Sequence, residues 1–251
     1  GYAPTWGWPW WWRETTVHLR IEYEKGREVR HLPHLALVRA MERAMRRACL
    51  PVALTAGFNP HLKMSLGTVL PVGVWGRREL LDVELAEHVP VEEVVERLQK
   101  VMPPGLHVRR AAELAPGAPA LQAAVNAAVY SLGVAEPCAE QEVARVVERV
   151  MAAERLEVLS RGKTARVKDL RPGISAMRLR RRAGVLRIEA LVAAGDAGNV
   201  RADELELALR QAGLDCEVSD VCRAGVYALA DGVTHSLLDG KRVDAWNDDW
   251  S

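Results

Sequence analysis

Residues 29–84 read VRHLPHLALVRAMERAMRRACLPVALTAGFNPHLKMSLGTVLPVGVWGRRELLDVE, and they carry the clearest structural pattern of the chain. Within them, residues 34–48 place apolar and basic side chains on two separate helical stripes. The apolar stripe holds Leu35, Val38, Met41, Met45 and Ala48, and the basic stripe holds Arg39, Arg43, Arg46 and Arg47. We therefore predict an amphipathic helix that packs through one side and keeps the other side positive.

The residues around this helix predict a small sheet covered by two helices. Pro51 ends the first helix, and a polar loop at 57–67, whose Phe58 is expected to fill the core, separates two apolar runs. Strands are expected at 17–23, 52–55, 79–85 and 106–111, and a second helix at 91–101. This order is βαββαβ, the ferredoxin-like arrangement, and it spans residues 15–113.

The same order of elements returns in the second half of the chain. Residues 114–121, LAPGAPAL, have the composition of a linker. After them, strands are expected at 123–133, 156–159, 174–182, 185–192 and within 216–229, and helices at 139–153 and 202–212, the last one capped by Gly213. We therefore predict an α+β fold of two tandem ferredoxin-like units, of which the second, at 122–230, carries an inserted strand.

The two ends of the chain stand apart from this pattern. Residues 1–14 contain five of the eight tryptophans, and their order fits neither the helical nor the strand period. We expect this tryptophan-rich tail to be disordered or extraneous to the fold, as short terminal segments often are. Residues 231–251 are expected to form a C-terminal tail.

Charge is unevenly distributed, although the whole chain carries a formal net charge of only +1. Residues 155–187 hold eleven Lys and Arg residues against Glu157 and Asp169, so the rest of the chain is net acidic. Such segregation can steer a polyanion toward one region of a protein. A nucleic acid is therefore a candidate partner.

The cysteines and the hydropathy indicate a cytoplasmic protein. Cys49, Cys138, Cys216 and Cys222 form neither a CxxC pair nor a CxxxCxxC run, and we expect all of them to be reduced thiols without a bound metal. No apolar run reaches the roughly 20 residues that cross a bilayer, and no segment resembles a signal peptide. We expect no membrane partner.

The motifs HLPHLALVRAMERAMRRACLP, GFNPHLKMSLG, LPVG and ELLDVEL resemble those of the radical-SAM-linked family of uncharacterised bacterial proteins, which occur beside or fused to radical SAM enzymes. The resemblance covers about residues 17–229 and is dense only before Leu85. Where that family has a Ser-His-Leu-Asp run, this chain has Pro33-His34-Leu35-Ala36. The resemblance implies a separate radical SAM enzyme as partner, and the iron–sulfur cluster and S-adenosylmethionine would belong to that enzyme.

Three groups of residues are candidates for binding a substrate. The first is the basic helix stripe of Arg39, Arg43, Arg46 and Arg47, the second is the loop with Asn59, His61 and Lys63, and the third is Arg178, Arg180 and Arg182. The last three alternate in sequence, so a strand presents them on one face, where they suit the phosphates of a nucleic acid. We expect the arginine-bearing surfaces to face a common groove.

Three histidines provide an alternative, enzymatic interpretation. His31, His34 and His61, with arginine or lysine nearby, could cleave RNA without a metal, since histidine acts as a general base and a cation stabilises the phosphorane. Tandem ferredoxin-like endoribonucleases offer a fold-level analogy. The histidines form no zinc-ligand pattern.

Three functional hypotheses follow from these observations. The first is a non-catalytic module that presents RNA, or another substrate, to a separate radical SAM enzyme. The second is a metal-independent endoribonuclease that uses His31, His34 or His61. The third is a protein adaptor that docks on the radical SAM enzyme and binds no nucleic acid.

Overall fold

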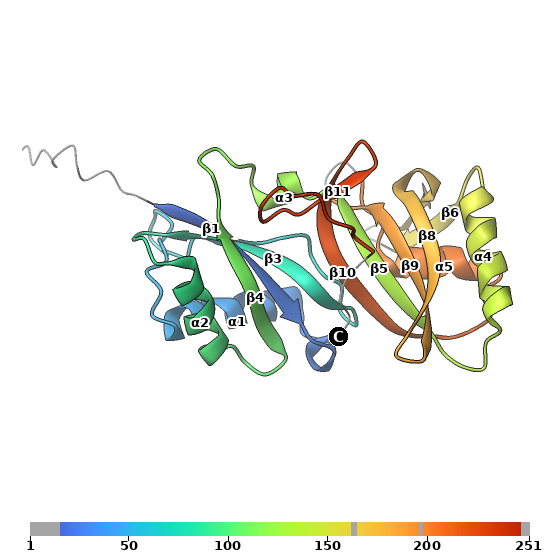
Figure 1. Cartoon of the computed structure of the whole chain (residues 1–251), viewed down its shortest axis with the longest axis horizontal. Helices are drawn as coiled ribbons and strands as arrows, with labels where there is room; N and C mark the ends of the chain where they lie inside the picture. Colours follow the sequence, from blue (N-terminus) through green and yellow to red (C-terminus); the bar gives the residue numbers. More distant parts are fainter. Residues whose placement is uncertain (1–15, 162–164, 196–197, 247–251) are drawn as a thin grey trace, which may run out of the picture.

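The computed structural model describes residues 16–161, 165–195 and 198–246, and the tryptophan-rich segment 1–14 lies outside them. The α+β class predicted from the sequence is confirmed (Figure 1). The first half contains β1 (Val17–Lys25), α1 (His34–Arg47), β2 (Met64–Leu66), β3 (Trp75–Leu85), α2 (Val91–Val101) and β4 (Leu106–Glu113). The second half contains α3 (Leu121–Ala124), β5 (Ala127–Val134), α4 (Glu140–Ala152), β6 (Glu157–Arg161), β7 (Ala165–Asp169), β8 (Ile174–Arg182), β9 (Val185–Ala193), α5 (Ala202–Gln211), β10 (Val218–Ala230) and β11 (Val233–His235).

One sheet runs through both halves of the chain. Its strand order is β4-β1-β3-β10-β5-β9-β8, with β2 paired to β3 and β11 paired to β10. The halves meet where β3 and β10 lie parallel, with Cys222 opposite Trp75 and Arg223 opposite Gly76. The other pairings in this sheet are antiparallel. Strands β6 and β7 form a separate two-stranded hairpin.

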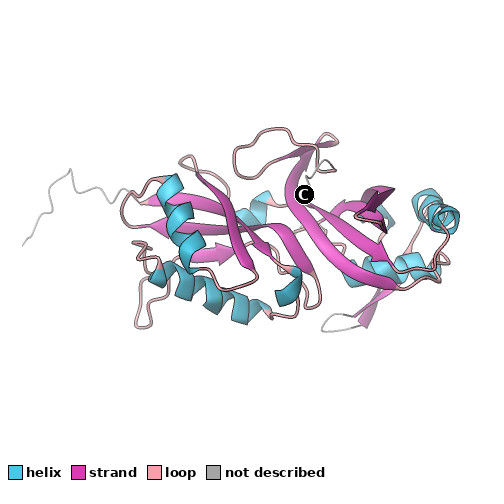
Figure 2. Ribbon diagram, turned by 60° about the horizontal axis from the view of Figure 1, so that its bottom comes forward, coloured by secondary structure: helices cyan, strands magenta, loops and turns pink. Residues whose placement is uncertain are grey.

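The four longer helices cover one face of this sheet. Helices α1 and α2 pack on β1, β3 and β4 over one apolar core, and α4 and α5 pack on β5, β8 and β9 over another (Figure 2). Glu79 and Arg223 form a buried ion pair between these cores. Tyr23 lies opposite Glu79 in the sheet and Tyr130 lies opposite Arg223, and all four side chains are buried. The helix-covered faces of the two halves are therefore continuous where β3 meets β10.

The predicted strand at residues 52–55 is wrong. Val52 and Leu54 make only isolated bridges, to Leu85 and Leu62. The second strand of the first half is instead β2, which pairs with β3 and lies inside the stretch that was predicted to be a polar loop. Its signal is the short alternation in which Ser65 is exposed and Leu66 is buried.

The predicted packing stripe of α1 is also shifted around the helix. Leu35 is 70% exposed, and the buried side chains are Leu37, Ala40, Met41, Ala44 and Met45. These positions follow the i, i+3, i+4, i+7 spacing of a helix face, and their two alanines let the helix backbone lie close to the sheet. Phe58, which was expected to fill the core, is fully exposed.

A buried carboxylate attaches the β6–β7 hairpin to α5. Ser160 donates a hydrogen bond to Glu204 Oε1 at 2.6 Å, and Lys168 Nζ donates one to Glu204 Oε2 at 2.8 Å. The backbone N–H of Arg201 also donates to this carboxylate, closing the first turn of the helix. Burial by itself would raise the pKa of Glu204, but these donors outweigh it and the pKa is lowered.

Acidification is expected to remove the stability that Glu204 supplies. Because its pKa is lower in the folded chain than in the unfolded one, its contribution is full above the unfolded pKa of about 4.3 and is lost as the pH falls through the folded value. Urea unfolding of the wild-type chain and of Glu204→Gln, at pH 7 and at stepwise lower pH, measures this contribution. The difference between the two chains should shrink with acidification, and a constant difference would contradict the assignment.

Candidate functional site

The first candidate site is the outer side of α1, named here the α1 surface and made of Arg39, Arg43, Arg46 and Arg47. All four side chains are exposed. Arg39, Arg43 and the adjacent Arg46 and Arg47 lie about one helical turn apart, a rise of about 6 Å for each four residues. Among the residues that the structure describes, none of the four makes an ion pair with a carboxylate. The predicted positive helix face is therefore present and open to a ligand.

An apolar groove runs beside the α1 surface. It has a volume of about 340 Å³ and lies between the first half of α1, the residues before it and the loop that leads to β4. Its apolar walls include Leu32, Pro103 and Pro104, and Arg39 and Arg43 stand on it as well. A ligand on the α1 surface can thus contact both positive charge and apolar area.

In the loop after α1, two of the three predicted binding residues are exposed and the third is paired with a carboxylate of β3. Asn59 and His61 are exposed, and Gly57 has a positive φ of +125°, which glycine adopts without strain. Lys63, in contrast, donates a hydrogen bond from Nζ to Glu84 at 2.8 Å. Its charge is therefore partly neutralised by the end of β3, whereas Asn59 and His61 remain available to a ligand.

The structure does not bring the three candidate histidines together. Residues 30–32 are held by Lys25 Nζ, which donates to the carbonyls of Arg30 and Leu32, and Lys25 lies opposite Gly76 at the start of β3. The loop with His61 is bound instead to Glu84, near the end of that strand. Glu84 lies eight residues after Gly76 along the strand, a span of about 26 Å. His31 and His34 therefore cannot share one scissile phosphate with His61.

The second basic group, named here the β8 surface, consists of Arg178, Arg180 and Arg182. Arg178 and Arg182 donate from Nε to the two carboxylate oxygens of Glu189 at 2.7 and 2.8 Å. All three guanidinium groups also donate to the backbone carbonyl of Trp246. As predicted, the three arginines share one face of the strand, but their own chain contacts that face.

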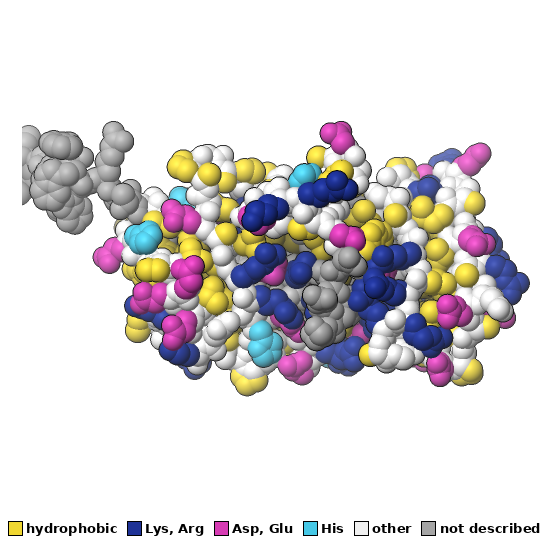
Figure 3. All heavy atoms as spheres, viewed as in Figure 1, with side chains coloured by type: hydrophobic (Ala, Val, Ile, Leu, Met, Phe, Trp, Pro, Cys, Tyr) yellow, Lys and Arg dark blue, Asp and Glu magenta, His cyan; other side chains and the backbone are white. Residues whose placement is uncertain are grey.

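The α1 and β8 surfaces do not face a common groove, contrary to the sequence-based expectation. Glu189 lies opposite Ser131 and Arg178 in the sheet register, on the face that carries no helix. Helix α1 covers the other face and points its arginines away from it. On the face without helices, Lys and Arg side chains gather over the middle of the sheet and over β8 (Figure 3). The two surfaces would therefore contact different parts of any large ligand.

Sequence reasoning missed an acidic residue at the centre of the uncovered face. Asp220 accepts hydrogen bonds from Trp75 Nε1 at 2.9 Å, from Arg27 at 2.9 Å and from Arg187 at 3.0 Å. The guanidinium of Arg27 also lies 5.4 Å from the ring centroid of Trp75, at cation–π distance. These residues come from distant segments, so no local motif announced the cluster.

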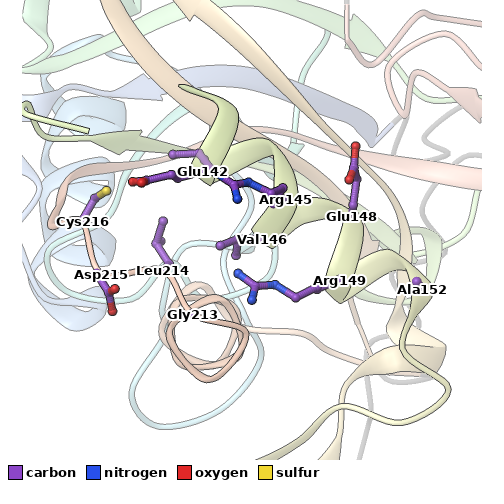
Figure 4. A pocket seen from close by; sticks show the side chains of 11 residues that line it. Glu142, Arg145, Val146, Glu148, Arg149, Ala152, Gly213, Leu214, Asp215 and Cys216 are labelled. Atoms are coloured by element: carbon purple, nitrogen blue, oxygen red, sulfur yellow. The ribbon is translucent and has the colours of Figure 1, made fainter. Parts of the chain in front are cut away.

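Another cavity lies at the far end of the second half, between α4 and the loop after α5. It measures about 500 Å³. Figure 4 shows Arg145 and Arg149 extending from α4 toward the loop of residues 213–216. Glu142 and Glu148 accompany them, so the lining is mixed in charge. Within the described ranges, no group of three or more His, Cys, Asp or Glu side chains is arranged to hold a metal ion.

The prediction that every cysteine is a free thiol is wrong for Cys138 and Cys216, which form a disulfide with 6.0 Å between their Cα atoms. Cys138 precedes α4 and Cys216 follows α5, so the bond joins the ends of the two helices that cover the second half. Cys49 is free and exposed, and Cys222 is free and buried. Burial raises the pKa of the Cys222 thiol well above its ordinary value.

Fold and site together define an α+β chain with one continuous mixed sheet, an arginine-lined helix and a second arginine cluster on the opposite face of the sheet. Within the described residues, no helix is both long and apolar enough to cross a membrane. The chain belongs to the family described as uncharacterized protein conserved in bacteria (DUF2344), which matches residues 18–202. No curated protein matches the chain in sequence. The predicted membership of an uncharacterised bacterial family is thus confirmed.

Proposed function

We propose that the protein is a non-catalytic recognition module that binds RNA through the α1 surface. One observation carries this proposal: Arg39, Arg43, Arg46 and Arg47 are all exposed, and no carboxylate of the described chain pairs with any of them. Arginines that only stabilise a fold commonly pair with local acids, as Arg97 does with Glu93 on α2. Four unpaired arginines on one helix side instead suit a polyanion.

The chemistry of the α1 surface fits phosphate recognition. A guanidinium group presents a planar fork of N–H donors that matches two phosphate oxygens. Each phosphate that is neutralised releases condensed counterions, so binding weakens steeply as salt is added. Asn59 and His61, on the exposed loop beyond the helix, can add hydrogen bonds to sugar or base.

The radical SAM context of the resemblance completes the proposal. In this scheme the module holds the RNA while a separate radical SAM enzyme modifies it, and the iron–sulfur cluster and S-adenosylmethionine belong to that enzyme. The endoribonuclease alternative has less support, since His31 and His34 lie far from His61 along β3.

A protein adaptor remains the second candidate, because one observation favours it. The groove beside α1 has apolar walls and carries Arg39 and Arg43. An amphipathic helix with acidic flanks binds such grooves through its apolar face. In that case the α1 surface would contact carboxylates of the radical SAM enzyme and no nucleic acid.

We also infer that each half of the chain is a ferredoxin-like unit. In the first half the order β4-β1-β3-β2 is antiparallel throughout, and in the second half so is the order β10-β5-β9-β8. Both orders support a βαββαβ connection with two helices on one face. The β6–β7 hairpin would be the insertion in the second unit.

The RNA proposal is tested by reversing charge on the α1 surface. We expect Arg43→Glu combined with Arg46→Glu to weaken the binding of a fluorescently labelled RNA hairpin with single-stranded ends by more than about tenfold. The slope of log K against log salt should also become shallower by about two, since each lost phosphate contact removes about one unit. Fluorescence anisotropy at several salt concentrations measures both quantities.

A matched control comes from α4, where Arg145 and Arg149 are also exposed on a helix. Arg145→Glu combined with Arg149→Glu makes the same change of net charge and should leave RNA affinity close to that of the wild-type chain. Equal losses of RNA affinity in both double variants would show that the effect comes from overall charge and not from the α1 surface. An affinity indifferent to salt and to the α1 variant would reject RNA recognition, and co-purification of the radical SAM protein lost only in the α1 variant would favour the adaptor.

A further inference from the structure

We propose that the β8 surface is a second RNA-binding site, for a nucleotide of a single strand, and that the chain's own residues 236–246 occupy it in this structure. The inference rests on the proposed function, because it assigns a further contact to the same class of ligand. It concerns the face of the sheet opposite α1. Residues 236–246 are named here the C-terminal strap.

The contacts of Trp246 carry the inference. Its backbone carbonyl accepts hydrogen bonds from Arg178 at 2.8 Å, from Arg182 at 3.2 Å and from Arg180 at 3.4 Å. Its ring lies beneath the guanidinium of Arg178, which is 4.6 Å from the ring centroid. Three cationic side chains thus converge on one neutral oxygen atom beside one aromatic ring.

Glu189 positions two of these arginines. Its side chain is 2% exposed, and it accepts a hydrogen bond from Arg178 on one oxygen and from Arg182 on the other. The buried carboxylate thereby fixes the direction of both guanidinium groups before any ligand arrives, which lowers the entropic cost of binding. Arg180 has no carboxylate partner among the described residues, and it lies directly opposite Arg187 in the register. An anion is therefore favoured at Arg180.

The arrangement matches what a nucleotide offers. A phosphate oxygen accepts the same guanidinium N–H groups as the carbonyl of Trp246 and adds a full negative charge, which strengthens each bond. A nucleobase stacks on an arginine guanidinium as the tryptophan ring does. Side chains at every second strand position lie about 6.6 Å apart, so the row of arginines can follow an extended backbone.

The strap contacts the three arginines through its last residue: among its described residues, Trp246 alone accepts hydrogen bonds from them, so a ligand has to displace only this end. Its hairpin is bound by backbone hydrogen bonds such as Val243 N–H to the Thr234 carbonyl, and Ala245 is buried against the uncovered face of the sheet. Yet a cavity of about 280 Å³ remains where Trp246, Arg242 and Leu191 meet. A ligand can enter this space beside Trp246 and compete for the same arginines.

Removing the end of the strap tests the inference. Deletion of residues 246–251 should tighten the binding of a labelled single-stranded RNA, by about tenfold if the strap leaves the site free one-tenth of the time. Trp246→Ala should give a smaller change in the same direction. The gain must disappear when Arg180→Glu is added to the deletion, because the freed site then repels phosphate.

Arg181→Glu is the matched control on the same strand. Arg181 lies on the other side of β8, where Glu140 accepts its hydrogen bond at 3.3 Å. The deletion chain with Arg181→Glu should keep the gain in affinity. A deletion without any gain, or a gain that survives Arg180→Glu, would overturn the inference. Thermal unfolding followed by circular dichroism identifies any variant that fails to fold, and Trp246→Ala in the full chain then gives the deciding measurement.

The outcomes separate this inference from the proposed function. If the α1 double variant loses RNA and the deletion changes nothing, the module binds RNA and the β8 surface takes no part. If the deletion creates binding that depends on Arg180 while the α1 variant behaves like the wild-type chain, the β8 surface binds RNA and the assignment to α1 fails.

Discussion

Replacing Glu79 by alanine is expected to lower the free energy of unfolding by about 3–5 kcal/mol. Glu79 and Arg223 are both buried, and the Nε of Arg223 donates to Glu79 Oε1 at 2.8 Å. Without the carboxylate, the guanidinium keeps neutral partners, among them the Thr68 carbonyl at 2.7 Å and the Tyr130 side chain, and its charge stays buried without an opposite charge beside it. Burial lowers the pKa of Arg223 and the Glu79 carboxylate raises it by more, so the pair is ionised in the wild-type chain. In the variant the guanidinium still keeps its proton, because arginine is effectively always protonated in proteins.

Urea unfolding followed by circular dichroism measures this loss. The matched control is Glu96→Ala, which breaks the exposed Glu96–Lys100 pair on α2 and should cost no more than about 0.5 kcal/mol. Because Glu79 and Arg223 join β3 to β10, the variant should also loosen the contact between the two halves. A loss below about 1 kcal/mol would mean that water reaches the pair and that the junction is less tightly packed than described.

Reduction of the Cys138–Cys216 disulfide is expected to lower the free energy of unfolding by about 4 kcal/mol. The bond closes a long loop, since its cysteines are 78 residues apart in sequence, and opening it restores conformational freedom to the unfolded chain. The comparison is between urea midpoints with and without dithiothreitol. Alkylation of the denatured chain should modify two cysteines without reductant and four with it.

Two variants make the disulfide result specific. Cys138→Ser combined with Cys216→Ser should already have the lower stability and should not respond to dithiothreitol. Cys49→Ser removes an exposed free thiol and should respond as the wild-type chain does. If all four cysteines react before reduction, the bond is absent and the original prediction of reduced thiols would be right.

Local patterns predicted an element correctly where its apolar and polar side chains follow the period of a helix or of a strand. The helix expected at 91–101 is α2 with the same bounds, and the valine stripe of α4, at Val143, Val146, Val147 and Val150, is fully in the core. The strands expected at 174–182 and 185–192 are also present, as β8 and β9. Prediction failed at residues 52–55 and for part of the packing stripe of α1, because short apolar runs and alanines give little periodic signal.

The candidate site shows the same division. Sequence alone identified every arginine of the α1 and β8 surfaces and the alternation that places Arg178, Arg180 and Arg182 on one face. It could not distinguish their environments, because Glu189 and Trp246, which contact the β8 arginines, carry no mark of their partners in sequence. The exposure of the α1 arginines depends equally on which carboxylates lie nearby.

The sequence by itself determined the helices, most of the strands and the clustering of positive charge, since these depend on residues within a few positions of one another. Only the tertiary structure decided that one sheet joins the halves, through two residue pairs between β3 and β10. It also decided that the arginine surfaces lie on opposite faces of that sheet and that the C-terminal strap covers one of them. The physical reason is that strand pairing and charge pairing join residues far apart in the chain, and their free energies depend on distances that no local pattern encodes.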